Sequence, residues 1–203
     1  MKNQKGSASV WILIIIVILV VVGGIYFYFN NTSTNISPTP ASSGEITIEQ
    51  SPYINSSLGF EINLPQSWST TIEKNNPNTV LVSDPSLKYT SELSITSVPA
   101  IDFGSSVDLT NIATQDNLVK AVLSTFSSGT GFTFHENNRI SSTTVEITFT
   151  QSISGLTYNS SDYLYFTSQR LYEVVQKIST TDSNAQYVTQ LLSASFNTFK
   201  IIQ

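Results

Sequence analysis

The sequence predicts an α+β domain with a largely antiparallel sheet, preceded by one membrane-spanning helix. Short segments of alternating apolar and polar residues dominate residues 46–203, and only two segments there have a helical period. Strands that are grouped around two helices, instead of alternating strictly with them, favour the α+β class and antiparallel pairing. The third observation is an uncharged apolar run of 20 residues, Val10–Phe29, which predicts the helix in the membrane.

The apolar run has the length and the flanking residues of a membrane anchor. At about 1.5 Å per residue, a helix over Val10–Phe29 is roughly 30 Å long, which matches the hydrocarbon thickness of a bilayer. Trp11 and two tyrosines lie near its ends, where aromatic rings suit the boundary between water and lipid. Lys2 and Lys5 precede it, so residues 1–9 are expected in the cytoplasm and the remaining chain outside the cell membrane.

Two alternatives concern the processing of this N-terminal segment. A cleaved signal peptide has a shorter apolar core of about 7–15 residues, so an uncleaved anchor is the better prediction. The stretch Lys5-Gly6-Ser7 resembles a prepilin processing site, with cleavage after Gly6. However, Trp11 stands at the fifth position of that mature chain, where pilins usually carry Glu. A pilin-like structural subunit therefore remains an alternative.

Residues 30–45 are expected to be a flexible linker, and residues 46–203 a single domain. The linker combines two prolines with Ser, Thr and Asn and has no apolar period. The 158 residues that follow are enough for one hydrophobic core. They carry seven basic and 13 acidic residues, a net charge of −6 that disfavours nucleic-acid binding. The chain has no cysteine, which excludes disulfides and lipoprotein anchoring.

Within this domain the sequence predicts seven strands and two helices. One helix is expected around the apolar stripe from Ile112 to Phe126, because Gly129 follows as a stop signal. The other is expected from Val188 to Phe199, after an Asp182-Ser183 capping signal. The expected strands alternate apolar and polar residues and are 60–64, 79–83, 93–98, 132–136, 144–150, 161–167 and 170–178.

One segment resembles a known family. Gly59-Phe60 followed by Pro65-Gln66-Ser67-Trp68 resembles the opening of PsbP-like domains, the family of extrinsic subunits of the oxygen-evolving photosystem, which has bacterial relatives. The order of elements over residues 50–203 is also similar, with a C-terminal Phe-x-x-Phe at Phe196 and Phe199. The resemblance implies an α/β/α sandwich around a central antiparallel sheet, and a protein-binding or accessory role instead of catalysis. No manganese, calcium or chloride site of the family can be matched, and photosystem activity does not carry over.

The sequence predicts no catalytic, metal-binding or cofactor-binding residue. His135 is the single histidine, and Arg139 stands where a zinc-protease helix would place its second one. No nucleophile-elbow, dinucleotide-binding or EF-hand motif is present. We expect the His135 ring at the surface of a strand or turn. A cell-envelope hydrolase that uses His135 and carboxylates is the enzymatic alternative.

Two tyrosines are the candidate partner-binding residues. The aromatic residues near Asn159-Ser160-Ser161 are expected to crowd a hairpin, with Tyr163 and Tyr165 on one face of the following strand. An exposed pair would form a binding patch, and the alternative is simple packing with wet hydroxyls. The sequence therefore predicts a non-catalytic binding or accessory domain, anchored in the cell membrane and facing outward toward a protein partner.

Overall fold

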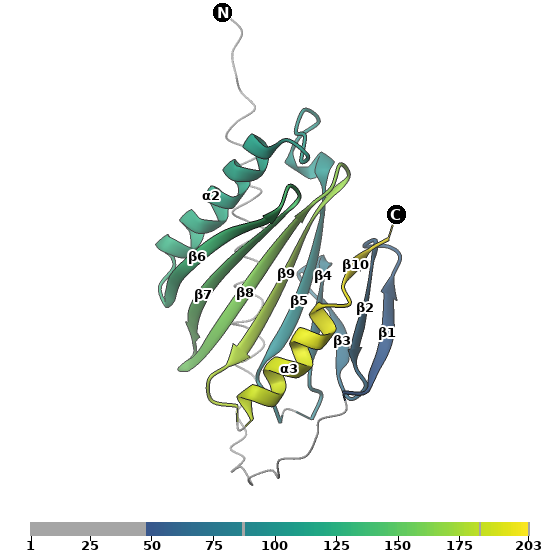
Figure 1. Ribbon diagram of the computed structural model, residues 1–203, viewed down its shortest axis with the longest axis vertical. Helices are drawn as coiled ribbons and strands as arrows, with labels where there is room; N and C mark the ends of the chain where they lie inside the picture. The colour runs from purple at the N-terminus through teal and green to yellow at the C-terminus, as the bar shows by residue number, and fades with distance from the viewer. Residues whose placement is uncertain (1–47, 87, 183, 203) are drawn as a thin grey trace, which may run out of the picture.

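A computed structural model describes residues 48–86, 88–182 and 184–202 of the chain (Figure 1). The predicted anchor Val10–Phe29, the linker 30–45 and the Gly6 processing site lie outside these residues. No helix in the described part of the chain is both long and apolar enough to cross a membrane. The described elements are β1 (Gln50–Asn55), β2 (Phe60–Pro65), β3 (Ser69–Glu73), β4 (Asn76–Ser83), β5 (Glu92–Pro99), the 3₁₀ helix η1 (Ala100–Phe103), α2 (Ile112–Ser128), β6 (Phe132–Ser141), β7 (Thr144–Ile153), β8 (Leu156–Phe166), β9 (Arg170–Ser179), α3 (Ala185–Phe196) and β10 (Lys200–Ile201).

The strands form two antiparallel sheets. The larger has seven strands in the order β3-β4-β5-β9-β8-β7-β6, and the smaller has the order β1-β2-β10. Every strand pair in the described residues is antiparallel, which confirms the predicted α+β class. The second sheet was not predicted. The alternation of apolar and polar residues identifies a strand but does not identify the strands that pair with it. The partners of β2 are β1 and β10, which lie near the two ends of the described chain.

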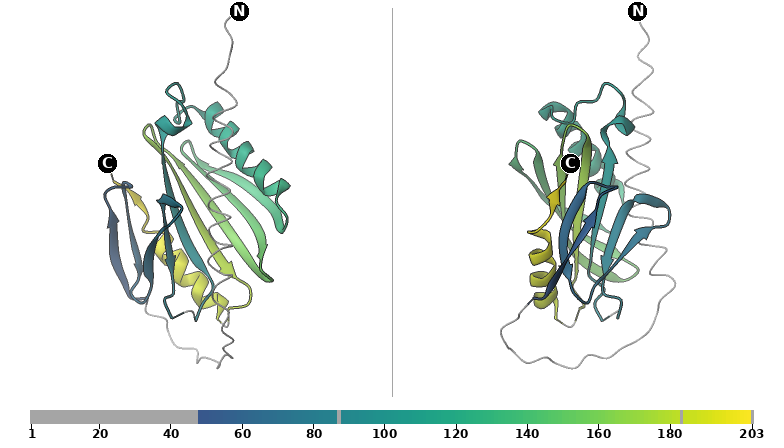
Figure 2. Two further views of the ribbon diagram at one scale, coloured as in Figure 1. Left: turned by 180° about the vertical axis from the view of Figure 1, so that it is seen from behind. Right: turned by 90° about the vertical axis from the view of Figure 1, so that its right-hand side faces the viewer.

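The two helices pack on opposite faces of the large sheet (Figures 1 and 2). Alternation along the central strand β9 makes this possible, because successive side chains point to opposite faces. Leu171 and Val175 join the core under α2, whereas Tyr172 and Val174 join the core under α3. The flanking helices therefore agree with the layering that the resemblance implied, and the three-stranded sheet is an addition to it.

The first predicted helix is confirmed, together with its stop signal at Gly129. Asn111 is the N-cap, and its side-chain oxygen accepts from the backbone N–H groups of Ala113 and Thr114 at 2.9 and 3.2 Å. At the other end, the N–H of Gly129 donates to the carbonyls of Thr125 and Phe126. The helix buries Val119, Val122 and Phe126 of the predicted stripe against β7 and β8, whereas Ile112 at its start is exposed.

The second helix begins differently from the prediction. Asp182 was expected to cap it, but α3 begins at Ala185 with no side-chain cap from its N-cap residue, Asn184. The carboxylate of Asp182 instead accepts four hydrogen bonds, from the N–H and hydroxyl groups of Thr90 and Ser91, at 2.6–3.1 Å. The capping prediction is wrong because the Asp182 carboxylate is bound by a distant loop, and Asn184, two residues later, takes the N-cap position.

The predicted hairpin at Asn159-Ser160-Ser161 is also wrong. These three residues lie inside the continuous strand β8, paired with β7 on one side and β9 on the other. The turn lies earlier, at Ser154 and Gly155, which adopt φ values of 51° and 84°. Pairing on both sides satisfies the backbone groups of the turn-prone residues, and it overrides their local preference.

The Gly59-Phe60 segment joins the two sheets. Gly59 has a φ of 76°, and a side chain there would bring its Cβ within 2.8 Å of the Tyr172 hydroxyl on β9. That hydroxyl donates to the carbonyl of Gly59 at 3.1 Å, and the N–H of Ile202 donates to the same carbonyl at 2.9 Å. The ring of Phe60 is fully buried, between those of Tyr53 and Phe199.

We expect Phe60→Ala to lower the free energy of unfolding by about 3–5 kcal/mol, because it leaves a cavity between the two sheets. Ile54→Ala on the neighbouring strand is the control, since Ile54 is 59% exposed and its loss should cost less than about 0.5 kcal/mol. Denaturant titration of the full chain, followed by circular dichroism, measures both values. Equal effects of the two substitutions would show that Phe60 does not anchor the small sheet.

Candidate functional site

The single histidine lies on the exposed edge strand β6, as predicted. Its Nε2 is 2.7 Å from the Thr150 hydroxyl, which lies 3.5 Å from the side-chain oxygen of Asn159. The imidazole ring is thus linked to a hydroxyl group and, through it, to an amide. Neither group is the carboxylate that orients a catalytic histidine. Within the described residues, no group of three or more His, Cys, Asp or Glu side chains is arranged to hold a metal ion.

Tyr163 and Tyr165 share one face of β8, as predicted, and both are half-buried, against the last residue of α3 and the chain that follows it. The Tyr163 ring lies 4.2 Å from that of Phe196, and the Tyr165 ring lies 5.2 Å from that of Phe199. Burial raises the pKa of Tyr165 to about 12. Burial also raises the pKa of Tyr163, as does its hydrogen bond to the Glu146 carboxylate. Their partner-binding role stays a prediction.

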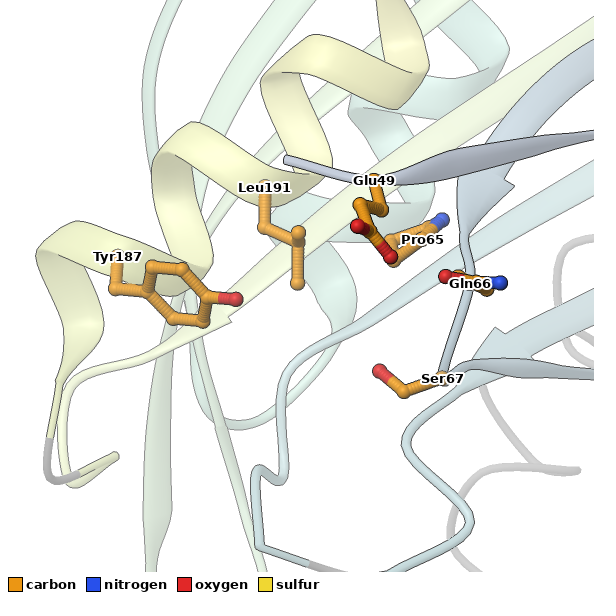
Figure 3. Close-up of a pocket in the computed structure, with 6 residues that line it drawn as sticks. All are labelled: Glu49, Pro65, Gln66, Ser67, Tyr187 and Leu191. Atoms are coloured by element: carbon orange, nitrogen blue, oxygen red, sulfur yellow. The ribbon is translucent and has the colours of Figure 1, made fainter. Parts of the chain in front are cut away.

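A pocket opens between α3 and the end of β2 (Figure 3). Its volume is about 390 Å³, near the lower end of the usual range for ligand sites. Tyr187 and Leu191 of α3 line one side (Figure 3). The opposite side is formed by the residue before β1 and by the residues at the end of β2 and just after it. We call it the α3 pocket; it is lined by Glu49, Pro65, Gln66, Ser67, Tyr187 and Leu191.

The backbone holds the wall of the α3 pocket opposite α3 in place. The N–H of Gln66 donates to the carbonyl of Glu49 at 3.0 Å, and the N–H of Trp68 donates to the carbonyl of Pro65 at 2.9 Å. Pro65 and Leu191 are buried, whereas the side chains of Glu49, Gln66 and Ser67 are exposed. The pocket therefore has an apolar floor and a rim of oxygen atoms.

The second feature is a cluster of buried polar and ionisable side chains on the face of the large sheet that α2 covers. Lys177 on β9 donates to Glu92 on β5 at 3.1 Å, and both side chains are less than a tenth exposed. Asp162 on β8 is fully buried, and within the described residues no N–H or hydroxyl group donates to it. Besides these, the cluster contains Glu73, Ser94, Ser160 and Glu173.

Two carboxyl groups of the cluster behave as a pair. Asp162 and Glu173 occupy diagonal positions on β8 and β9, on the same face of the sheet. Burial raises the pKa of Glu173 to about 7. Burial, and then the charge of Glu173, raise the pKa of Asp162 well above its usual range. Two negative charges this close in a buried site repel each other, so the pair favours a state in which one carboxyl group keeps its proton.

The outer edge of β6 is the third feature. This ten-residue strand is the last in the large sheet, and every residue from Thr133 to Ser141 is exposed. Phe134 and Ile140 are 44% and 58% exposed. Register shifts with β7 fall next to these two residues, between Phe134 and Glu136 and between Arg139 and Ser141. The edge therefore presents unpaired backbone groups flanked by two apolar side chains.

Sequence reasoning missed all three of these sites. The pocket joins residues from the start of β1, the end of β2 and α3, and no local pattern links them. The polar cluster had a signal, because Glu173 and Lys177 alternate with the apolar residues Leu171 and Val175 along β9. The edge strand had one as well, since the alternation that begins at Phe132 ends at Glu136, and residues 136–139 are all polar.

Comparisons with known proteins identify the fold. No family model matches the sequence, and no curated protein sequence matches it. Among solved structures, the solution structure of cyanobacterial PsbP (CyanoP) from Synechocystis sp. PCC 6803 is similar, with a TM-score of 0.52 and 14% identity. The match covers 81% of this chain and 99% of that one. The described domain has a PsbP-like fold. The prediction from Gly59-Phe60 and Pro65–Trp68 is thereby confirmed at the level of the fold.

Two other solved structures are more distant. A crystal structure from Bacteroides thetaiotaomicron has a TM-score of 0.48 and 13% identity, over 75% of this chain and 48% of that one. The match thus spans about half the length of the Bacteroides protein. LpqN of Mycobacterium tuberculosis, described as involved in cell envelope biogenesis, has a TM-score of 0.45 and 10% identity, over 77% of this chain and 92% of LpqN. At this distance neither likeness informs the function of the PsbP-like domain.

The carboxyl pair makes stability depend on pH. Because folding raises both pKa values, the folded domain binds more protons than the unfolded chain between about pH 4 and pH 7, and its stability falls as the pH rises through that range. Each pKa unit corresponds to about 1.4 kcal/mol. We expect Asp162→Asn to flatten this decline when denaturant titrations are compared at pH 5 and pH 8.

Asp102→Asn is the matched control, since Asp102 is exposed on η1. It should leave the slope of stability against pH unchanged. The same slope in the wild-type chain and in Asp162→Asn would show that the pair does not share a proton.

Proposed function

We propose that this protein is a membrane-anchored accessory module whose PsbP-like domain binds a protein partner outside the cell membrane without catalysing a reaction. The exposed edge of β6 is the observation that carries the binding role. Val10–Phe29 carries the location, because an uncharged run of that length and composition inserts readily into a bilayer. Residues 30–45 then act as a flexible spacer between bilayer and domain.

The β6 edge suits an extended segment of a partner protein. A strand that adds to a sheet edge gains main-chain hydrogen bonds, while pockets or side chains on the edge select its sequence. Between its two register shifts, β6 keeps a regular segment, Glu136–Arg139, for such pairing. Phe134 and Ile140 flank this segment as apolar contacts. Irregularities of this kind also discourage long self-pairing of edges, so a heterologous partner is favoured over a second copy.

We also propose that Tyr163 and Tyr165 border this interface. They lie on β8, two strands from the edge, on the face where His135 meets Thr150. Packing against α3 fixes their rings, and a rigid aromatic edge loses little conformational entropy on binding. In this arrangement His135 is a surface contact and has no catalytic role.

The anchor is tested by where the full chain is found. We expect it in the membrane fraction, with the domain digested by protease added to spheroplasts, and we expect deletion of residues 10–29 to release it. Mass spectrometry of the mature N-terminus separates the alternatives. A chain that begins at Ser7 would favour a pilin-like subunit, and cleavage after Phe29 would contradict an uncleaved anchor.

The β6 edge is tested by site-specific photo-crosslinking in cells. We expect a crosslinker at Asn137 of the full chain to give one discrete adduct. The double substitution of Phe134 and Ile140 by Asp should reduce its yield about tenfold, the equivalent of roughly 1.4 kcal/mol of binding energy. Thr71 on β3, at the opposite edge of the sheet, is the control position. Equal adducts from both positions, or no effect of the double substitution, would contradict the proposal.

A further inference from the structure

We propose that the α3 pocket binds the ammonium group of a lysine side chain on the partner. The inference rests on the proposed function only in taking that partner to be a protein. The pocket lies at the opposite side of the large sheet from β6, next to the small sheet (Figure 1). It is therefore a second contact site, separate from the edge strand.

The charge of the pocket selects a cation. Glu49 is the one charged residue among the six that line it. Its carboxylate is exposed on the rim, where an incoming group reaches it without unfolding the wall. The surrounding domain is acidic, which attracts basic segments and repels anions before contact.

The remaining polar groups of the pocket match an ammonium group. Besides the carboxylate, the side-chain oxygens of Gln66, Ser67 and Tyr187 all accept hydrogen bonds. A lysine ammonium has three donors and no acceptor, so it uses several of these oxygens at once. Figure 3 shows the Tyr187 hydroxyl directed from α3 toward the side where Glu49, Gln66 and Ser67 lie. A hydrogen bond in which both partners are charged is also stronger than a neutral one.

The apolar part of the pocket matches the lysine stem. Pro65 and Leu191 are buried at its floor, where they offer apolar surface to four methylene groups. The Tyr187 ring adds a face over which a cation is attracted. This ring is itself held by its neighbour Tyr89, whose centroid is 6.2 Å away. A volume of about 390 Å³ accepts a side chain with part of its backbone.

The test is a titration of the isotope-labelled full chain in detergent micelles, followed by NMR. The probe is Nα-acetyl-lysine methylamide, and its Nε-acetylated form is the uncharged comparison. We expect the lysine probe to shift the amide signals of Gln66, Ser67 and Leu191, and acetylation to weaken binding at least about tenfold. Glu49→Gln should weaken it about tenfold as well. Glu136→Gln, an equal charge change on β6, should leave it unchanged.

Three outcomes would overturn the inference: equal binding of both probe forms, equal effects of the two Glu→Gln substitutions, or binding only to vesicles that contain phosphatidylethanolamine. The last outcome would assign the pocket to a lipid headgroup. If the lysine probe does not bind but the crosslink at Asn137 still forms, the proposal for the α3 pocket is rejected and the edge-strand interface is not. Retained probe binding with no crosslink at Asn137 rejects the edge-strand interface and leaves the pocket intact.

Discussion

The burial of strand β9 on both faces is the constraint on which the rest of the structure depends. It is the central strand of the large sheet, and every residue from Leu171 to Lys177 is buried. Each face therefore needs a cover. On one face α2 supplies it over Leu171 and Val175, and on the other α3 supplies it over Tyr172 and Val174. Tyr172 also reaches Gly59, so the same strand holds the small sheet in place.

The buried polar cluster places charged residues on the α2-side face of the large sheet, where each charge needs a partner or a proton. Lys177 and Glu92 compensate each other at 3.1 Å, as a buried ion pair must if it is to avoid an uncompensated charge. For Asp162 and Glu173, burial raises both pKa values, which favours a protonated, less charged pair. Replacing a buried ion pair with apolar residues is often neutral or stabilising. The stability of the fold therefore does not explain why these charged residues are present.

The proposed binding surfaces lie where the two-faced packing ends. The β6 edge is the last strand of the sheet, and the α3 pocket lies beside the small sheet, where Leu191 of the core forms part of its floor. The anchor and linker predicted for residues 10–45 would allow both surfaces to face a partner at the membrane.

The sequence by itself determined both helices, seven of the ten described strands and the family-like opening, but it missed β1, β3 and β10. Apolar periods located α2, and the signature at Gly59-Phe60 identified the fold, because local patterns record which face of an element is buried. Pairing between distant segments was decided only by the tertiary structure. Asp182 left its expected cap for Thr90 and Ser91, and Asn159–Ser161 became strand instead of turn. The α3 pocket and the Asp162–Glu173 pair follow from the same cause: their members are adjacent in space but not in sequence, and no local pattern encodes that adjacency.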